Sequence, residues 1–306
     1  MKSKSILVVV MVVCVMTVAN IASATIIRGI NIDFVTIGNP GNPGDTRVEA
    51  NPSGCGVVGY EYQIGKYEVT NAQWNAFVSA AGAPTGNPSN AYDQSTYSTG
   101  TQQPTNGVSW YETLQFCNYL TSGDKSKGVY QFSGNNTNPG DFLGIDRNAA
   151  ISAFGTVYVI PTEDEWYKAA YYKPDGSGYS SYTNGQNTIP APDNGWNYYG
   201  GAYSSPWDVG TGTLEQNGTY DMMGNVSEWN ETLLFWEWKE TLLCPIYGVR
   251  GGACNSSPYN RLGSSYRADS DPYNEGFNLG FRVASVPEPT TLLLLGLGGL
   301  MLRKKQ

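Results

Sequence analysis

The chain has 306 residues and contains 22 tyrosines, 8 tryptophans and 37 glycines, but no histidine. Without an imidazole it has no Ser-His-Asp triad, no His-ligated zinc or iron site, and no histidine acid or base. The formal charge of −8 opposes binding to a phosphate backbone, so we expect no nucleic-acid partner. The length suffices for one large domain or two small ones with a substantial core.

Residues 1–24 have the features of a secretory signal peptide. Lys2 and Lys4 precede an apolar run over residues 6–18, and a small-residue cleavage motif ends at Ala24. An apolar run of 13 residues is too short to anchor a protein across a bilayer. The sequence therefore predicts export by the secretion machinery.

The last segment, residues 287–306, has three parts. It begins with Pro287, Glu288 and Pro289, and an apolar stretch over residues 292–302 precedes a basic end. Eleven apolar residues make a poor permanent transmembrane helix, so we expect only transient membrane contact. The tail resembles the PEP-CTERM sorting signal of Gram-negative bacteria. This resemblance implies processing by an exosortase and delivery to the cell surface or extracellular matrix.

The exported domain, residues 25–286, is acidic, with 13 basic and 25 acidic residues and a formal charge of −12. Its four cysteines allow three pairings in an oxidising compartment. Cys244 and Cys254 are the favoured pair, because they are close in sequence and flank an expected strand. The alternative is that one or more thiols are buried and free, with Cys117 the candidate on the apolar side of a helix.

The ordered elements of this domain are short. In chain order, we expect strands at 60–64 and 67–69, helices at 72–78 after Thr70-Asn71 and 110–120 after Ser109, a strand at 156–160, a helix after Thr162 with Glu165 in a capping box, and strands at 246–250 and 279–284. Long polar, Gly/Asn/Ser/Tyr-rich stretches cover 36–54, 83–106, 133–148 and 173–219. Such loops favour an irregular α+β domain over a βαβ array.

The ordered blocks together resemble one family, the formylglycine-generating-enzyme or sulfatase-modifying factor domain. The matching segments are 64–71, 107–110, 160–166, 220–229, 249–252, Arg267 and 280–282. Each block alone is weak, but their order across residues 55–286 is specific. The resemblance implies a C-type-lectin-like, loop-rich α+β fold.

Catalysis is a separate question, because the oxidases of this family bind copper with two cysteines that follow a Gly-Gly motif. Here Gly251-Gly252 is followed by Cys254 alone, and Tyr259 stands five positions later. One thiolate cannot form a two-coordinate Cu(I) site, so we expect no copper. Sulfoxide synthases of the family use histidines from an additional domain, and this chain contains neither. Cys254 is the one candidate catalytic residue.

Calcium is the cofactor that the resemblance implies. Carried over residue by residue, the ligands are the Asp221 side chain, the Gly224 and Val226 carbonyls, and the Glu228 carboxylate. Carboxylates mixed with backbone carbonyls suit calcium. The alternative is that Asp221 and Glu228 only cap and solvate a turn that buries Trp229.

Three arginines of the family motifs, Arg250, Arg267 and Arg282, are interpreted as structural, since guanidinium groups often tie loops to carboxylates or carbonyls. The acidic triplet over residues 163–165 is interpreted as helix-start charges, because adjacent helical residues do not share a face.

Aromatic residues crowd the polar loops between residues 171 and 207. Such faces suit sugar or peptide recognition, and the alternative is that the loops supply their own packing.

These observations predict an exported, non-catalytic surface or matrix binding module that uses its variable loops. Its expected partner is an extracellular polysaccharide or protein. The alternative is an oxidoreductase, either of the formylglycine-generating type, which oxidises a protein cysteine, or with an unrecognised site at Cys254, Ser256 and Tyr259. A third hypothesis is a structural matrix component.

Overall fold

The computed structural model describes residues 23–86, 98–134, 136–192, 195–199, 205–239, 242–257 and 261–286. Most of the predicted signal peptide and the sorting residues Pro287, Glu288 and Pro289 lie outside these ranges. Within the described ranges, no helix has the length and apolar character needed to cross a membrane.

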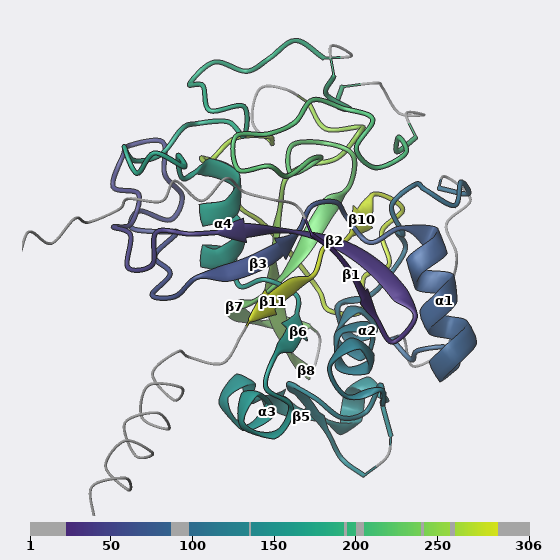
Figure 1. Ribbon diagram of the computed structural model, residues 1–306. Helices are drawn as coiled ribbons and strands as arrows, with labels where there is room; N and C mark the ends of the chain where they lie inside the picture. Colours follow the sequence, from purple (N-terminus) through teal and green to yellow (C-terminus); the bar gives the residue numbers. More distant parts are fainter. Residues whose placement is uncertain are drawn as a thin grey trace, which may run out of the picture.

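A five-stranded sheet joins the two ends of the domain (Figure 1). Its order is β1 (Ser23–Ile27), β2 (Ile30–Ile37), β3 (Tyr62–Gly65), β11 (Ala284–Val286) and β6 (Val157–Val159). Every neighbouring pair is antiparallel. The sequence predicted β3, β6 and part of this C-terminal strand region, but it gave no sign of β1 and β2. Ala24 lies inside β1 opposite Asp33, so cleavage after Ala24 would leave only the second half of β1.

The segment expected as a strand at 67–69 is not one. After Gly65 the chain leaves the sheet, and the Lys66 amide donates to the Asp33 carbonyl. The Val69 amide then donates to the carbonyl of Phe281, near the C-terminal end. Pairing with distant segments therefore replaces the expected local hairpin.

The three expected helices are confirmed as α1 (Asn71–Ala81), α2 (Trp110–Ser122) and α4 (Glu163–Tyr171). Each begins with a complete capping box. The cap hydroxyl and a Glu or Gln three residues later accept hydrogen bonds from two backbone amides that have no partner within the helix. The sequence missed α3 (Arg147–Phe154), whose cap is Asp146.

Part of the stretch expected as loop at 133–148 is ordered. It contains a 3₁₀ turn, η1 (Pro139–Asp141), and β5 (Phe142–Ile145), which pairs with β4 (Tyr130–Phe132).

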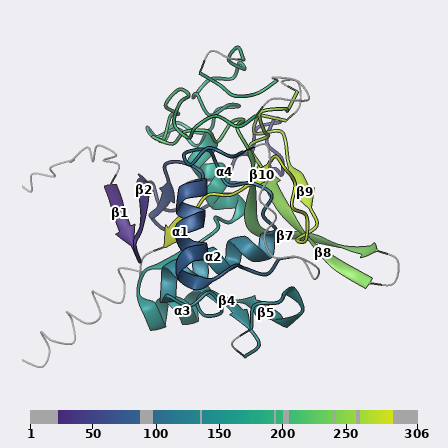
Figure 2. The ribbon, with the colours of Figure 1, turned by 90° about the vertical axis from the view of Figure 1, so that its right-hand side faces the viewer.

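The second sheet has the order β10-β7-β8-β9. It consists of β7 (Ser227–Lys239), β8 (Leu242–Arg250), β9 (Ala268–Ser270) and β10 (Leu279–Gly280). Figure 2 shows that β7 and β8 continue as a two-stranded ribbon beyond the body of the domain. The sequence predicted the inner end of β8 and the residues of β10. The single strand expected at 279–284 is divided, because its start forms β10 in this sheet and its last residue begins β11 in the other sheet.

Aromatic side chains fill the space between the helices and the two sheets. Trp74 stacks on Phe116, with ring centroids 5.7 Å apart, and so joins α1 to α2. Trp110 stacks on Tyr247 at 3.7 Å and joins α2 to β8. Cys117 lies fully buried in this core, as the sequence indicated.

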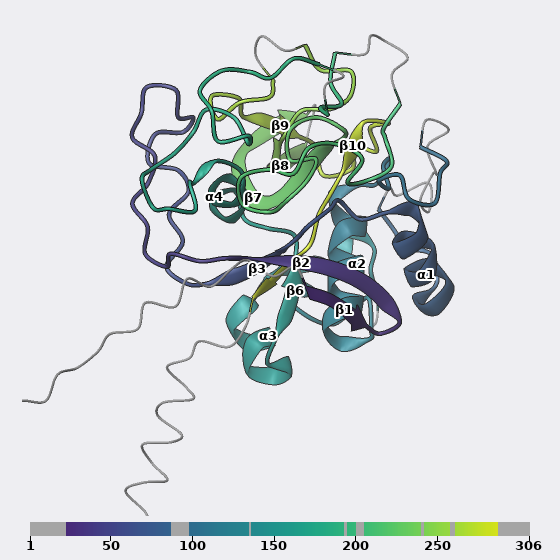
Figure 3. The same cartoon turned by 45° about the horizontal axis from the view of Figure 1, so that its top comes forward.

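The long loops gather at one end of the domain, around α4 and the inner ends of β7 and β8 (Figures 1 and 3). They have a small core of their own, made of Trp196, Tyr198, Met223 and Leu262. Most of the loop aromatics are therefore used for packing, which supports the alternative interpretation of their abundance.

The Arg147 guanidinium fixes the start of α3 against two other elements. It donates to Glu165 of α4 at 2.7 Å and to Glu231 of β7 at 2.9 Å. Both carboxylates are almost completely buried.

Replacing Arg147 tests this clamp. Arg147→Met leaves two buried carboxylates without a counter-charge, and we expect the free energy of unfolding to fall by about 3–5 kcal/mol. The control is Lys127→Met, which removes an exposed pair with Asp124 and is expected to cost less than about 1 kcal/mol. Urea denaturation measures both values, and equal losses in the two variants would contradict the assignment.

Candidate functional site

The predicted calcium residue Glu228 lies at the centre of a buried ion pair. Its two carboxylate oxygens accept hydrogen bonds from Arg282, both at 2.6 Å, and both side chains are 0% exposed. The Trp166 indole donates to the same carboxylate at 2.7 Å. Arg282 also donates to the backbone carbonyls of Gly65 and Tyr220. This arginine therefore ties four segments together, and its structural interpretation is confirmed.

Of the other predicted calcium ligands, the Asp221 carboxylate accepts the Gly210 amide at 2.8 Å, and the Val226 amide donates to Glu68 at 3.1 Å. In the part of the chain that the structure describes, no group of three or more Cys, Asp or Glu side chains is placed to hold a metal. The predicted site would use two carboxylates and two backbone carbonyls, and Glu228 is bound to Arg282 and Trp166 as arranged here. Calcium binding stays a prediction.

The other two motif arginines converge on Glu163, at the start of α4. Arg250 donates to Glu163 at 2.6 and 2.9 Å, and Arg267 donates to it at 2.8 Å and through a second nitrogen. Burial alone would raise the pKa of Glu163, but the hydrogen bonds from Arg267 and Arg250 hold it below its usual range. The three acidic residues at this helix start thus have separate partners, since Asp164 accepts the Gly56 amide and Glu165 pairs with Arg147.

The favoured disulfide between Cys244 and Cys254 is wrong, because all four described cysteines are free of disulfides and buried. Cys244 pairs with Glu237 near the outer end of β7, whereas the Cys254 amide donates to Asn225, just before β7 begins. β8 runs six residues from Cys244 to Arg250 at its inner end, so at about 3.3 Å per residue Cys244 lies roughly 20 Å along the strand from the end that Cys254 follows. A disulfide requires Cα atoms within about 7 Å. Tyr259 lies outside the described residues.

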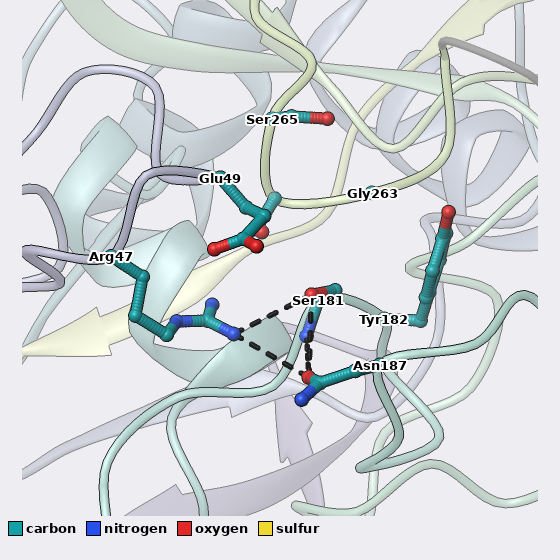
Figure 4. Close-up of a pocket in the computed structure, with 8 residues that line it drawn as sticks. Arg47, Glu49, Ser181, Tyr182, Asn187, Gly263 and Ser265 are labelled. Carbon is teal, nitrogen blue, oxygen red and sulfur yellow. Dashed lines mark hydrogen bonds between the residues drawn. The ribbon is translucent and has the colours of Figure 1, made fainter.

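A pocket at the loop end lies between three loops (Figure 4). Its volume is about 390 Å³. The lining residues are Arg47, Glu49, Ser181, Tyr182, Asn187, Gly263, Ser264 and Ser265. One wall, residues 263–265, belongs to the segment that follows Gly251-Gly252. The lining offers a guanidinium, a carboxylate, an amide and several hydroxyls.

A family model for the sulfatase-modifying factor enzyme 1-like domain matches residues 38–286. The chain belongs to this family. The sulfatase-modifying factor domain thus covers β3 to β11, the ion pairs of Arg250, Arg267 and Arg282, and the pocket, while β1 and β2 precede it. A second model, the PEP-CTERM protein-sorting motif, matches residues 285–305. The protein is therefore exported to the surface or exterior of a Gram-negative cell, by exosortase-dependent sorting.

Several proteins are similar to this one. The chaperone protein LppX of Paenibacillus barcinonensis is 27% identical over 246 residues, which cover 73% of this chain and 79% of that protein. Among solved structures, Treponema denticola variable protein 1 matches with a TM-score of 0.61 at 20% identity, over 89% of this chain and all of that one. The structure of CarF matches with a TM-score of 0.60 at 20% identity, over 84% of this chain and 99% of that one. The structure of PvdO from Pseudomonas aeruginosa matches with a TM-score of 0.56 at 18% identity, over 83% of this chain and 94% of that one. These structures show the fold alone.

Arg47 is held rigidly at the side of the pocket in this family member. Asp45, which is 1% exposed, accepts two hydrogen bonds from the guanidinium, at 2.7 and 2.9 Å. Burial would raise the pKa of Asp45, but hydrogen bonds from Arg47 and Tyr167 lower it overall. The remaining guanidinium nitrogen points toward Ser181 and Asn187 at 3.5 Å (Figure 4).

The pocket could not be found from the sequence of this sulfatase-modifying factor domain. Its walls come from three loops, with about 130 residues between Arg47 and Ser181 and about 80 between Tyr182 and Gly263. By itself, each of these loop sequences predicts only a polar turn. Tyr182 alone carried a signal, as one of the aromatics in the expected recognition loops.

The sequence analysis also missed two buried acids beneath the loops. Burial raises the pKa of Glu215 to about 7, against hydrogen bonds that favour its ionised form. Burial raises the pKa of Glu68 well above its usual range, and repulsion from Asp221 and Glu228 adds to the shift. Because the pKa of each carboxyl is raised, both acids stabilise the folded state more when they are protonated than when they are ionised.

The role of Glu228 is tested by melting. Glu228→Gln leaves Arg282 buried without a counter-charge, so we expect the free energy of unfolding to fall by about 3–5 kcal/mol. The double variant Glu228→Gln/Arg282→Met is expected to recover part of this loss. The predicted calcium site is tested in the same assay. It predicts a wild-type melting temperature that EDTA lowers and that Glu228→Gln makes insensitive to EDTA, and an unchanged wild-type melting temperature in EDTA would refute it.

Glu215 predicts a pH dependence. Its folded pKa of about 7 lies above the ordinary 4.5, so its contribution to stability is complete below pH 4.5 and is lost as pH rises through about 7. Gln cannot ionise, so between low and high pH the Glu215→Gln variant should lose about 3 kcal/mol less unfolding free energy than the wild type. Unfolding free energies at several pH values between about 4.5 and 8 measure the difference. The same change at the exposed Glu61 controls for the removed charge, and parallel profiles for wild type and Glu215→Gln would refute the prediction.

Proposed function

We propose that the exported domain is a non-catalytic binding module that holds a hydroxyl-rich ligand, such as a sugar of an extracellular polysaccharide, in the loop pocket. The pocket itself carries the proposal. Its lining of guanidinium, carboxylate, amide and hydroxyl groups matches the alternating donors and acceptors of a sugar. Its volume of about 390 Å³ is in the range of small-ligand sites.

Preorganisation supports binding at this place. Arg47 is fixed by the buried Asp45, so little side-chain freedom is lost when the guanidinium meets a ligand. Tyr182 faces it from another loop and adds a rigid aromatic surface (Figure 4). Ser181 and Asn187 lie between these two groups.

The competing oxidase function finds less support. A catalytic thiolate needs access to its substrate and an environment that lowers its pKa. Cys254 is 1% exposed, and the segment after Gly251-Gly252 contains no second cysteine. The family fold therefore supports a binding role more directly than thiol chemistry.

A glycan array tests the proposal. We expect the fluorescently labelled exported protein to retain at least one extracellular polysaccharide fragment, and Tyr182→Ala and Glu49→Ala to weaken that binding about tenfold or more. Both positions are partly or fully exposed, so the fold should be preserved. Asn39→Ala, in a second cavity beside Tyr172, is the matched control and should bind normally. No retained glycan, or unchanged binding by the pocket variants, would contradict the proposal.

A further inference from the structure

Among the residues that the structure describes, no strand flanks the outer part of the β7–β8 ribbon. We call residues 233–239 and 242–246 the outer ribbon. β10 pairs with β7 only at residues 227 and 228, and β9 pairs with β8 only at residues 247–249. Figure 2 shows the outer ribbon extending away from the other elements.

One face of the outer ribbon is apolar and uncovered. Trp236 lies opposite Pro245, and Trp238 lies opposite Leu243, so these four side chains share a face. Trp236 is 55% exposed, Trp238 71% and Leu243 41%. In contrast, four tryptophans of the core are fully buried: Trp74, Trp110, Trp166 and Trp229. We call the apolar face of the outer ribbon the tryptophan face. Clusters of this kind on a soluble domain mark interaction sites.

The opposite face is only partly covered. Cys244 and Ile246 are buried there, whereas Phe235, opposite Ile246, is 46% exposed. Lys239 forms an ion pair with Asp271 at 2.5 Å, which ties the outer ribbon to the segment after β9.

The two edges of the outer ribbon differ. On the β8 edge, Pro245 interrupts the row of backbone donors, which is a known protection of strand edges. The β7 edge, Leu233–Lys239, contains no proline, and among the described residues its outward backbone groups have no backbone partner outside the ribbon. Glu237 and Lys239 add charge to this edge, but Phe235, Trp236 and Trp238 are exposed beside them, and an open strand edge is a template for pairing with another chain.

We infer that the Leu233–Lys239 edge of β7 binds an extended apolar segment of a partner polypeptide by strand addition. The backbone of the segment would continue the sheet, and alternate side chains would pack on the tryptophan face, where Trp residues make strong contacts. The inference concerns a surface separate from the loop pocket and holds whether or not the pocket binds a sugar.

Charge disfavours a second copy of this chain as the occupant. Each exported domain has a formal charge of −12, so two copies repel one another.

A membrane surface is disfavoured by charge. The exported domain has a formal charge of −12, which opposes its approach to anionic lipid headgroups, whereas a neutral or basic peptide segment meets no such barrier.

The experiment measures fluorescence anisotropy of a labelled peptide, acetyl-Lys-Val-Thr-Val-Thr-Val-Lys-amide, titrated with the full exported chain. We expect saturable binding. Trp236→Thr/Trp238→Thr should weaken it about tenfold or more without changing the melting temperature, because both rings are exposed. A peptide N-methylated at alternate residues, which cannot pair as a strand, should also bind about tenfold more weakly. Leu143→Thr, an equally exposed apolar position on β5, is the matched control and should bind normally.

Three results would overturn the inference. These are absence of peptide binding at about 1 mM protein, equal binding of the N-methylated peptide, and a dimer in light scattering that the double tryptophan variant abolishes. The last result would identify a second copy as the occupant. None of them bears on sugar binding in the loop pocket, which Tyr182→Ala tests separately.

Discussion

The buried ion pair between Glu228 and Arg282 is the contact on which the loop end of this domain depends. Both side chains are fully buried, and the remaining arginine donors reach the carbonyls of Gly65 and Tyr220. Burying two charges is expensive unless the geometry is good and every donor is satisfied. Here the cost is offset by hydrogen bonds that join β7, the end of β3 and the loop before β7. Glu163 gathers Arg250 and Arg267 in the same way at the start of α4.

These ion pairs explain how a fold with so little regular structure keeps its loops in place. Helices and sheets satisfy their own backbone groups, but long loops need side chains to do so. The small loop core adds apolar packing around Trp196 and Tyr198. With the scaffold fixed by these contacts, the surface residues of the loops are free to vary, which suits a binding protein.

Local signals in the sequence predicted local structure. The capping boxes at Thr70, Ser109 and Thr162 fixed the starts of all three expected helices, because each box involves residues only three apart. The pairing of β11 with β3 and β6 could not be predicted, since strand partners more than 100 residues apart in the chain leave no local trace. The expected strand at 67–69 failed for the same reason. The hairpin of β1 and β2 was missed for another reason, because β1 begins at Ser23, inside the predicted signal peptide.

The predicted roles of individual residues were also confirmed in part and wrong in part. The arginines were correctly interpreted as structural, because a guanidinium near glycine-rich turns has few other uses. The partners of these arginines were not predicted. Glu228, which the sequence predicted as a calcium ligand, forms an ion pair with Arg282. Proximity in sequence also misled the pairing of Cys244 with Cys254, which the length of β7 separates. The pocket around Arg47 arises from three distant loops, and only the folded chain brings them together.

The central claim is that this sulfatase-modifying factor domain has kept the scaffold of its family for binding and does not carry out thiol-based oxidation. Titration of the purified exported chain with Cu(I), followed by incubation with a sulfatase-motif peptide and mass spectrometry, tests it most directly. The account predicts no tightly retained copper and an unchanged peptide cysteine. Stoichiometric copper retention, or conversion of that cysteine to formylglycine, would contradict it.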